Sequence, residues 1–359
     1  MTVKVFRSTD FGAPANTNAA GALIAILDAC LVNGYGAQTV TSITRTDTTA
    51  TVTTPSAHLL KDGTFMRISG AGQSDYNGDF AITVTGANTF TYTVANSPAT
   101  PATGTITSKV APVDWSKPFS GTNLAAYKTG AGSNGMFLRV DDTMVSAGAI
   151  ASDPIVQAYE NMTDIMTGTG LFSSGRAPQK AANASATWWY VLATEKTLYI
   201  ASSNGSYQCV MAFGDFLSKR PGDAFNTIAC FTSAHHSPDF YALSNSNANL
   251  SYHDVARPYT QIGGAVNVGF RSEGFQTVFG MNGYTYPCPL DGALHLSDIT
   301  ITEGASGVRG TMPGLWNIMH HYAFNTGDII IGTGDFTGKR FLVINLQQGQ
   351  CALEISDTW

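Results

Sequence analysis

Histidine is the residue type in this chain best suited to bind a metal ion, and the chain has seven histidines. Two pairs are adjacent, His235 with His236 and His320 with His321. Adjacent side chains on a strand point to opposite faces of a sheet, so neither pair can readily hold one ion by itself. A metal site would need one histidine from each pair to meet in the fold, and no acidic residue near them stands at ligand spacing. We therefore expect hydrogen-bonded histidines, with no metal and no cofactor.

The cysteines offer a second kind of chemistry, since thiolates bind metals and form disulfides. None of the five stands in a Cys-x-x-Cys or other metal-binding spacing; they are Cys30, Cys209, Cys230, Cys288 and Cys351. The number is odd, and the first residues lack the long apolar stretch of an export signal. Both features indicate free and mostly buried thiols without a disulfide framework.

Carboxylates and nucleophiles carry no recognisable catalytic pattern. Asp141 and Asp142 are adjacent at a predicted strand end, where solvation or a turn accounts for them, and the 25 acidic residues leave room for a dyad without marking one. There is no Gly-x-Ser-x-Gly elbow. The Gly-Thr-Gly segments at 168–170 and 332–334 lack the lysine and third glycine of a phosphate-binding loop. We expect no catalytic residues and no enzyme activity.

Aromatic residues are plentiful, and some of them could recognise a ligand. The candidates for glycan stacking or for an interface between proteins are Trp188, Trp189, Tyr190 and Trp316. Exposed aromatic rings beside Asn and Asp would suit sugar stacking, as in an adhesin. Because Trp and Tyr are also enriched in β-cores and at protein interfaces, we favour the core or interface interpretation over glycan binding.

One short pattern occurs twice. Gly214-Asp215-Phe216 is followed by Lys219 and Arg220, and Gly334-Asp335-Phe336 by Lys339 and Arg340. We favour two similar hairpin turns, in which the Asp bonds turn amides and the Phe covers the end of a sheet. The alternative is a pair of docking turns that arose by duplication.

Composition limits the class of protein. Charged residues make up only 12% of the chain, about half of the ~25% usual for globular domains, and the net charge is −6. Such a chain lacks the basic face of a nucleic-acid binder. No run of eighteen apolar residues is present, so we expect no membrane insertion. A weakly charged Thr-, Ser- and Asn-rich surface suits close packing of repeated subunits.

The elements that must position these residues are mainly strands. One amphipathic helix is predicted near the N-terminus, with Thr17 or Asn18 as its cap and Gly34 or Gly36 at its end. Its apolar face carries Ala20, Leu23, Ile24, Leu27 and Leu31. Further strands are predicted near 136–141, 187–193, 197–201, 206–213, 227–231, 264–270, 275–281, 328–332, 340–346 and 351–356. A short helix is also considered, near 153–161.

Residues 38–109 have a different texture from the rest of the chain. Six short runs alternate Thr with Val, Ile or Phe and are separated by turns: 39–44, 50–54, 64–69, 80–85, 89–94 and 104–109. This pattern predicts a small antiparallel β-sandwich of immunoglobulin-like (Ig-like) character.

The same segment resembles an Ig-like module common in bacteriophage tail and virion proteins. The resemblance lies in residues 50–54, 58–59, 68–71, 76–78, 89–94 and 97–107, with a mild departure at 61–63. It covers about a fifth of the chain. It implies a non-catalytic module that decorates a phage structural protein.

Segments outside the module are similar to a family of phage virion proteins without assigned chemistry. They are residues 6–14, 115–128, 137–142, 213–225 and 353–359. This second resemblance implies a setting, the virion, and transfers no functional residues.

Together these observations predict a mainly β protein of two domains. Residues 1–37 with 110–359 would form an antiparallel β-sandwich or barrel body, and 38–109 an inserted Ig-like domain. We expect a virion structural protein, assembled in the bacterial host cytoplasm, that packs with copies of itself and with other virion proteins at the head exterior, neck, collar or tail. The alternatives are a fibre protein that binds a host-cell-surface glycan and, less favoured, a tail-borne polysaccharide depolymerase.

Overall fold

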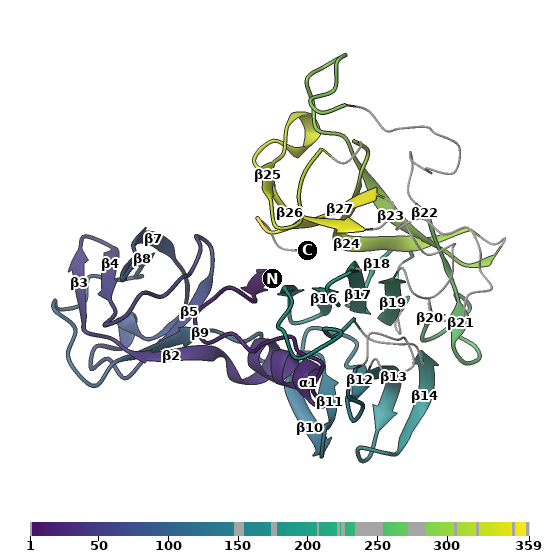
Figure 1. The fold of residues 1–359 in the computed structure, drawn as a ribbon, viewed down its shortest axis with the longest axis horizontal. Coiled ribbons are helices and arrows are strands. Elements are labelled where there is room, and N and C mark those ends of the chain that lie inside the picture. The colour runs from purple at the N-terminus through teal and green to yellow at the C-terminus, as the bar shows by residue number, and fades with distance from the viewer. Residues whose placement is uncertain are drawn as a thin grey trace.

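The computed structural model describes residues 2–359 except for 147–153, 174–177, 207, 221–222, 224–226, 234–253, 272–284, 305–306, 321–322, 347–348 and 357–358. Within this part the chain is mainly β, with antiparallel sheets and one helical segment near the N-terminus, as the sequence predicts (Figure 1). The expected strand at 275–281 lies outside the described residues.

A central sheet organises the body. Its strands, in spatial order, are β1 (Lys4–Arg7), β15 (Trp189–Ala193), β16 (Thr197–Ser203), β17 (Gln208–Asp215), β19 (Thr227–Ser233), β20 (Asp254–Val255) and β21 (Val266–Asn267). Strand β16 is buried at every position, since both faces of the sheet are covered. This explains why its sequence, TLYIASS, does not alternate between apolar and charged residues.

The C-terminal sheet covers one face of the central sheet. Its strands, in spatial order, are β22 (Gly269–Arg271), β23 (Leu296–Thr302), β24 (Val308–Ile318), β27 (Gly349–Glu354), β26 (Arg340–Leu346) and β25 (Ile329–Ile331), with β18 (Leu217–Ser218) paired to β24. Tyr199 and Val210 of the central sheet share a buried apolar cluster with Leu315 and Ile344 of this sheet. The two sheets therefore form a β-sandwich.

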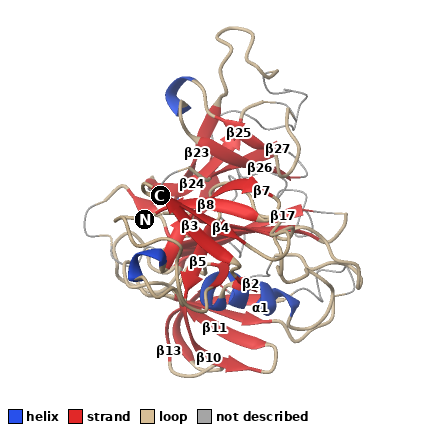
Figure 2. Cartoon of the chain, turned by 90° about the vertical axis from the view of Figure 1, so that its left-hand side faces the viewer, coloured by secondary structure: helices blue, strands red, loops and turns tan. Residues whose placement is uncertain are grey.

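The opposite face of the central sheet packs on the helical segment and a third sheet. The third sheet consists of β10 (Ser116–Gly121), β11 (Leu124–Lys128), β12 (Phe137–Asp141), β13 (Ile155–Met162) and β14 (Gly168–Ser173). The helical segment is α1 (Ala22–Leu27) followed by one π-helical stretch, Asp28–Asn33, and it lies against β11 (Figure 2). Leu23, Leu27 and Leu31 lie in one buried cluster with residues of both sheets, as their spacing predicts.

The helix starts differently from the prediction. Its N-cap is Gly21 in the left-handed conformation, with no capping side chain from Thr17 or Asn18. Instead Oδ2 of Asp142 accepts the backbone N–H of Leu23 at 2.8 Å. The predicted end at Gly34 is confirmed, because Gly34 caps the segment with a φ of 72°.

The helix considered near 153–161 is wrong. Residues 155–162 form β13, paired with β12 on one side and β14 on the other. Gln157, Ala158 and Glu160 tolerate a helix, but pairing on both sides and burial of Val156 with Ala158 override that local preference.

Residues 35–110 form two four-stranded sheets whose strands pair only with one another. One sheet is β2 (Tyr35–Thr39), β9 (Thr107–Val110), β5 (Phe65–Ser69) and β6 (Gly78–Ala81). The other is β3 (Ser42–Thr46), β4 (Thr49–Thr53), β8 (Thr89–Thr93) and β7 (Thr83–Gly86), and a short 3₁₀ turn spans Ser74–Tyr76. We call this pair of sheets the sandwich module; it stands to one side of the body in Figure 1.

Two of the six predicted runs in this module each supply two strands. The run at 39–44 passes from β2 to β3, and the run at 80–85 passes from β6 to β7. In each case the chain leaves one sheet and enters the other, as happens at the corners of sandwiches. Period-two alternation continues through such a crossing because both sheets face the same core, which contains Ile43, Ile68 and Phe90.

Ionic contacts tie the sandwich module to the body. Nζ of Lys4, in β1, lies 2.7 Å from Oδ2 of Asp79, in β6. Arg67, in β5, binds Asp79 at 2.6 Å and Asp114, which follows the module, at 2.6 Å. Asp79 and Arg67 of the module therefore contact residues of the body on both sides of it in the chain: Lys4 precedes the module and Asp114 follows it.

Candidate functional site

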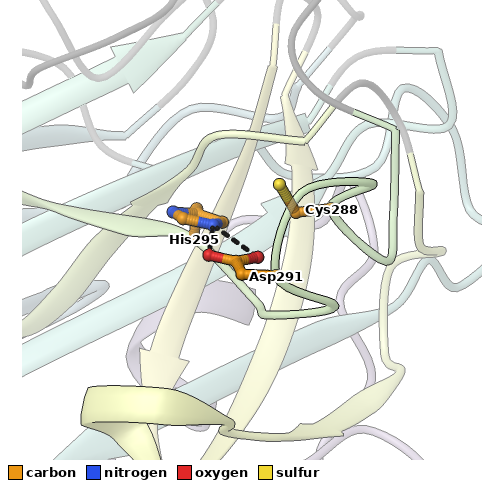
Figure 3. Close-up of side chains that lie close together, drawn as sticks. All are labelled: Cys288, Asp291 and His295. Carbon is orange, nitrogen blue, oxygen red and sulfur yellow. Dashed lines mark hydrogen bonds and ion pairs between the residues drawn. The ribbon is translucent and has the colours of Figure 1, made fainter.

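Three residues of different chemistry meet in the loop that leads into β23. They are Cys288, Asp291 and His295, and their potential ligand atoms all lie within 4.8 Å of one another (Figure 3). Nε2 of His295 is 3.0 Å from Oδ2 of Asp291. A thiol, a carboxylate and an imidazole at one point can share a proton or hold a metal ion.

The loop is shaped by its own hydrogen bonds. The backbone N–H of Gly292 donates to the carbonyl of Cys288 at 2.8 Å, and the N–H of Ala293 donates to Oδ1 of Asp291 at 2.9 Å. Gly292 has a φ of 69°, a conformation that favours glycine. This turn brings Asp291 back towards Cys288 and His295.

His320, which follows β24, fixes the position of His295 without belonging to the group. Its Nε2 accepts the backbone N–H of His295 at 2.8 Å, and its Nδ1 lies 3.1 Å from the carbonyl of Thr285. Since Nε2 must be the acceptor, Nδ1 carries the proton and donates to Thr285. The backbone carbonyl of His295 also accepts the N–H of Met319 at 3.1 Å.

The electrostatics keep the carboxylate ionised. The backbone N–H of Ala293, then the ring of His295, and the thiol of Cys288 lower the pKa of Asp291 below its ordinary value. The Asp291 side chain is half exposed, whereas the Cys288 residue is buried. Asp291 is therefore a charged acceptor at neutral pH, positioned between a buried sulfur and the solvent.

The signal for this group was present in the sequence as Cys-x-x-Asp-x-x-x-His within eight residues. The expectation that a metal site needs one histidine from each adjacent pair overlooks this group, because His295 belongs to neither pair. Of those pairs, only His320 lies in the described part of the chain; His235, His236 and His321 fall outside it.

The four predicted aromatic residues do not form one surface. Trp189 is 0% exposed, and its indole N–H donates to the carbonyl of Pro14 at 2.8 Å, so its ring offers no surface for a sugar. Trp188 and Tyr190 are half-buried neighbours, with ring centroids 5.7 Å apart, and both pack on the core between the central and C-terminal sheets. Trp316 belongs to a different apolar cluster.

The two Gly-Asp-Phe segments take different structures. Asp215 is the last residue of β17. Phe216 is buried, and Cζ of Arg309 lies 5.8 Å from the centroid of the Phe216 ring. Asp335 and Phe336 instead form a 3₁₀ turn, Gly334–Phe336, between β25 and β26. The predicted similarity of the two turns is therefore wrong. Pairing with β19 keeps Gly214 and Asp215 in a strand, whereas Gly334–Phe336 forms a turn between two strands.

Each phenylalanine nevertheless packs against its sheet. Phe336 lies edge-to-face on Trp316 at 5.0 Å, and Phe216 belongs to the core between the sheets. Phe216 is buried and unavailable for docking, while Asp335 is exposed at the surface. Asp215 accepts the backbone N–H of Asn134 at 3.1 Å.

The remaining predicted groups have structural partners. Asp141 lies 3.5 Å from Arg139, and Asp142 pairs with Lys180, so the two adjacent carboxylates are engaged separately. Cys30, Cys209, Cys288 and Cys351 are buried and form no disulfide, as expected. Burial raises the pKa of Cys351 to about 12. In the described part of the chain, no helix is long and apolar enough to cross a membrane.

Comparisons with known proteins do not place this chain in a family. No family model matches the chain, and no curated protein matches it. Among solved structures, the chain is similar to phage phi92 endosialidase at 13% sequence identity, over 90% of this chain and 52% of that one, with a TM-score of 0.19. The chain thus spans about half the length of that protein. A likeness this weak transfers neither an activity nor a residue role.

Proposed function

We propose that this chain is a bacteriophage virion structural protein that acts by assembly, with copies of itself and with other virion proteins, rather than by catalysis. The resemblance of residues 38–109 to phage Ig-like modules supports the setting. The low charge, 12% of residues, supports the mode of action, because close subunit packing then desolvates few charges.

The single observation that carries self-assembly is the edge strand β25. It pairs with β26 on one side and has no strand partner on the other among the described residues. Its outward residues are apolar: Ile329 is 39% exposed and Ile331 is 67% exposed. An exposed strand edge can pair with another chain, and the two exposed isoleucines of this three-residue strand would add apolar area to such a contact.

The sandwich module suits an outward projection. Its sheets are closed upon each other, and the ion pairs of Asp79 with Lys4 and of Arg67 with Asp114 fix it to the body at one end. Contacts between subunits would then involve the body, leaving the module for solvent, the host envelope or a neighbouring virion protein at the head exterior, neck or tail.

The test is mass photometry of the recombinant full-length chain, with negative-stain imaging of the same sample. A defined ring or large closed oligomer is expected. Replacing Ile329 and Ile331 together by Lys should reduce it to smaller species. Ile262→Lys is the control, since Ile262 is 82% exposed but lies between β20 and β21, strands of a different sheet. A wild-type monomer would contradict self-assembly.

A second candidate is glycan binding by a receptor-recognition protein. Trp188 and Tyr190 support it, since they are adjacent, partly exposed rings. Glycan-array binding that Trp188→Ala abolishes, in a variant that remains folded, would favour this function. Turnover of a polysaccharide by the purified chain would instead favour the depolymerase.

A further inference from the structure

We propose that Cys288, Asp291 and His295 bind one zinc ion. This site adjoins the end of β25, because the backbone N–H of Leu294 donates to Oγ1 of Thr333 at 2.7 Å. Its test reads zinc content and the Co²⁺ spectrum, neither of which depends on the oligomeric state. Thiolate, imidazole and carboxylate are the three donor types that zinc takes from proteins. The thiolate disfavours magnesium and calcium, which prefer oxygen ligands.

The distances between the donors suit one ion. In a tetrahedral zinc site, neighbouring nitrogen, oxygen and sulfur ligands stand about 3.4–3.6 Å apart. Here all three donor atoms lie within 4.8 Å of one another, and His295 Nε2 is 3.0 Å from Asp291 Oδ2. Side-chain adjustments of about 1 Å would bring the three to ligand geometry, and the Asp291–His295 hydrogen bond would be replaced by two metal bonds.

The supporting contacts are already in place. Metal sites depend on outer hydrogen bonds that orient the ligands. Oδ1 of Asp291 is held by the N–H of Ala293, which leaves Oδ2 directed at His295. The backbone of His295 is hydrogen-bonded on both sides, to His320 and to Met319, so the main chain from which the imidazole extends is held in place.

The position of the group also allows an ion to enter. Asp291 and His295 have side chains 50% and 36% exposed, whereas Cys288 is 4% exposed. Solvent therefore reaches the oxygen and nitrogen donors, while the sulfur lies on the protein side. The described residues supply three donors, and a water molecule would complete a tetrahedron.

Binding would fasten the loop to the C-terminal sheet. Cys288 lies eight residues before the start of β23 at Leu296, and His295 directly precedes that strand. An ion joining the two residues would close this loop and stabilise the folded chain by mass action, since the unfolded chain has no preformed site.

The experiment uses the full-length chain without a histidine tag, stripped with a chelator and titrated with Zn²⁺ or Co²⁺. We expect one equivalent of Zn²⁺ to bind, with a rise in melting temperature. The Co²⁺ form should show a thiolate-to-metal charge-transfer band and visible ligand-field bands. The charge-transfer band distinguishes this site from one built by histidines alone.

Three variants, Cys288→Ser, Asp291→Asn and His295→Gln, should each lower Zn²⁺ affinity. The loss should exceed the roughly 10- to 100-fold that follows removal of an outer partner. Asp164→Asn removes an exposed carboxylate between β13 and β14, in a different sheet, and should leave binding unchanged. Because Asp291 and His295 are surface residues, their variants should keep the fold even if Cys288→Ser does not. Absence of Zn²⁺ binding by the wild type, or full binding by Asp291→Asn and His295→Gln, would overturn the proposal.

Discussion

The amino nitrogen of Lys180 lies 2.5 Å from Oδ1 of Asp142, and both side chains are fully buried. Lys180 also donates to the carbonyls of Ala19 and Met144, each at 2.8 Å. The second oxygen of Asp142 accepts the N–H of Leu23 at the start of the helix. Burial raises the pKa of Asp142, and Lys180 opposes this effect. One ion pair thus joins the helix, the end of β12 and the segment before β15.

Removal of the Lys180 amine should strongly destabilise the chain. Lys180→Met leaves a buried carboxylate without its cation, which costs about 3–5 kcal/mol of unfolding free energy. Lys117→Met is the matched control, because Lys117 and Asp28 form a partly exposed pair worth about 0–1 kcal/mol. Urea denaturation followed by circular dichroism measures both. Equal effects would mean that burial of the Asp142 pair has no special weight.

The ion pairs at the base of the sandwich module should make stability depend on pH. Burial alone would raise the pKa of Asp79, but hydrogen bonds and charges from Arg67 and Lys4 outweigh it and lower the pKa. The unfolded chain therefore takes up this proton first, at about pH 3.9. The stabilisation is complete above that pH and is lost as the pH falls through the lower pKa of the folded state.

Asp79→Asn tests this dependence. The variant should lose about 1.5–3 kcal/mol at pH 7, as expected for hydrogen bonds to a charged group. Its unfolding free energy should also fall less steeply than that of the wild type as the pH drops below about 4. Chemical denaturation across this range provides the comparison. Parallel pH profiles would show that Asp79 does not contribute to acid sensitivity.

The two Gly-Asp-Phe segments should respond differently to the same substitution. A Cβ at Gly214, where φ is 128°, would come 2.1 Å from the carbonyl oxygen of Lys196. Gly214→Ala should therefore cost about 3 kcal/mol or more, from strain and a backbone clash. Gly334 has a φ of 58° with open space around it, so Gly334→Ala should cost about 1–2 kcal/mol. Thermal melts of both variants measure the difference, and similar losses would contradict it.

Replacement by Ala should destabilise the chain to clearly different extents at Trp188 and at Trp189. Trp189→Ala empties a fully buried site and should cost about 3–5 kcal/mol, whereas the half-buried Trp188 should cost less when replaced by Ala. Denaturation midpoints of the single variants test this order. The practical consequence is that loss of glycan binding in a Trp189 variant would report unfolding, so only Trp188→Ala can test a sugar contact.

The sequence by itself determined the class of the fold and many of its strands. Alternation of Thr with Val, Ile or Phe marked the strands of the sandwich module, and the spacing of Leu23, Leu27 and Leu31 marked the helix. These signals are local, because a residue's neighbours along the chain set which face of an element is apolar. Buried cysteines outside any disulfide followed from composition and were confirmed for the four that the structure describes.

Tertiary structure decided which surfaces those elements meet. Gln157 and Glu160 lie in a strand because β12 and β14 pair with it on either side. Asp142 caps the helix from 119 residues away, and no local pattern encodes such a contact. The burial of Trp189 and Phe216 likewise depends on which sheet covers them.

The cluster of Cys288, Asp291 and His295 depends on both local sequence and tertiary structure. Its spacing is local, but the approach of the three donor atoms depends on the turn at Gly292 and on two hydrogen bonds of the His295 backbone, whose N–H donates to His320 and whose carbonyl accepts from Met319. Sequence supplies the residue types and the periodicity of each element. Only the packed chain fixes which side chains meet, because burial and long-range pairing outweigh the weak preferences of individual residues.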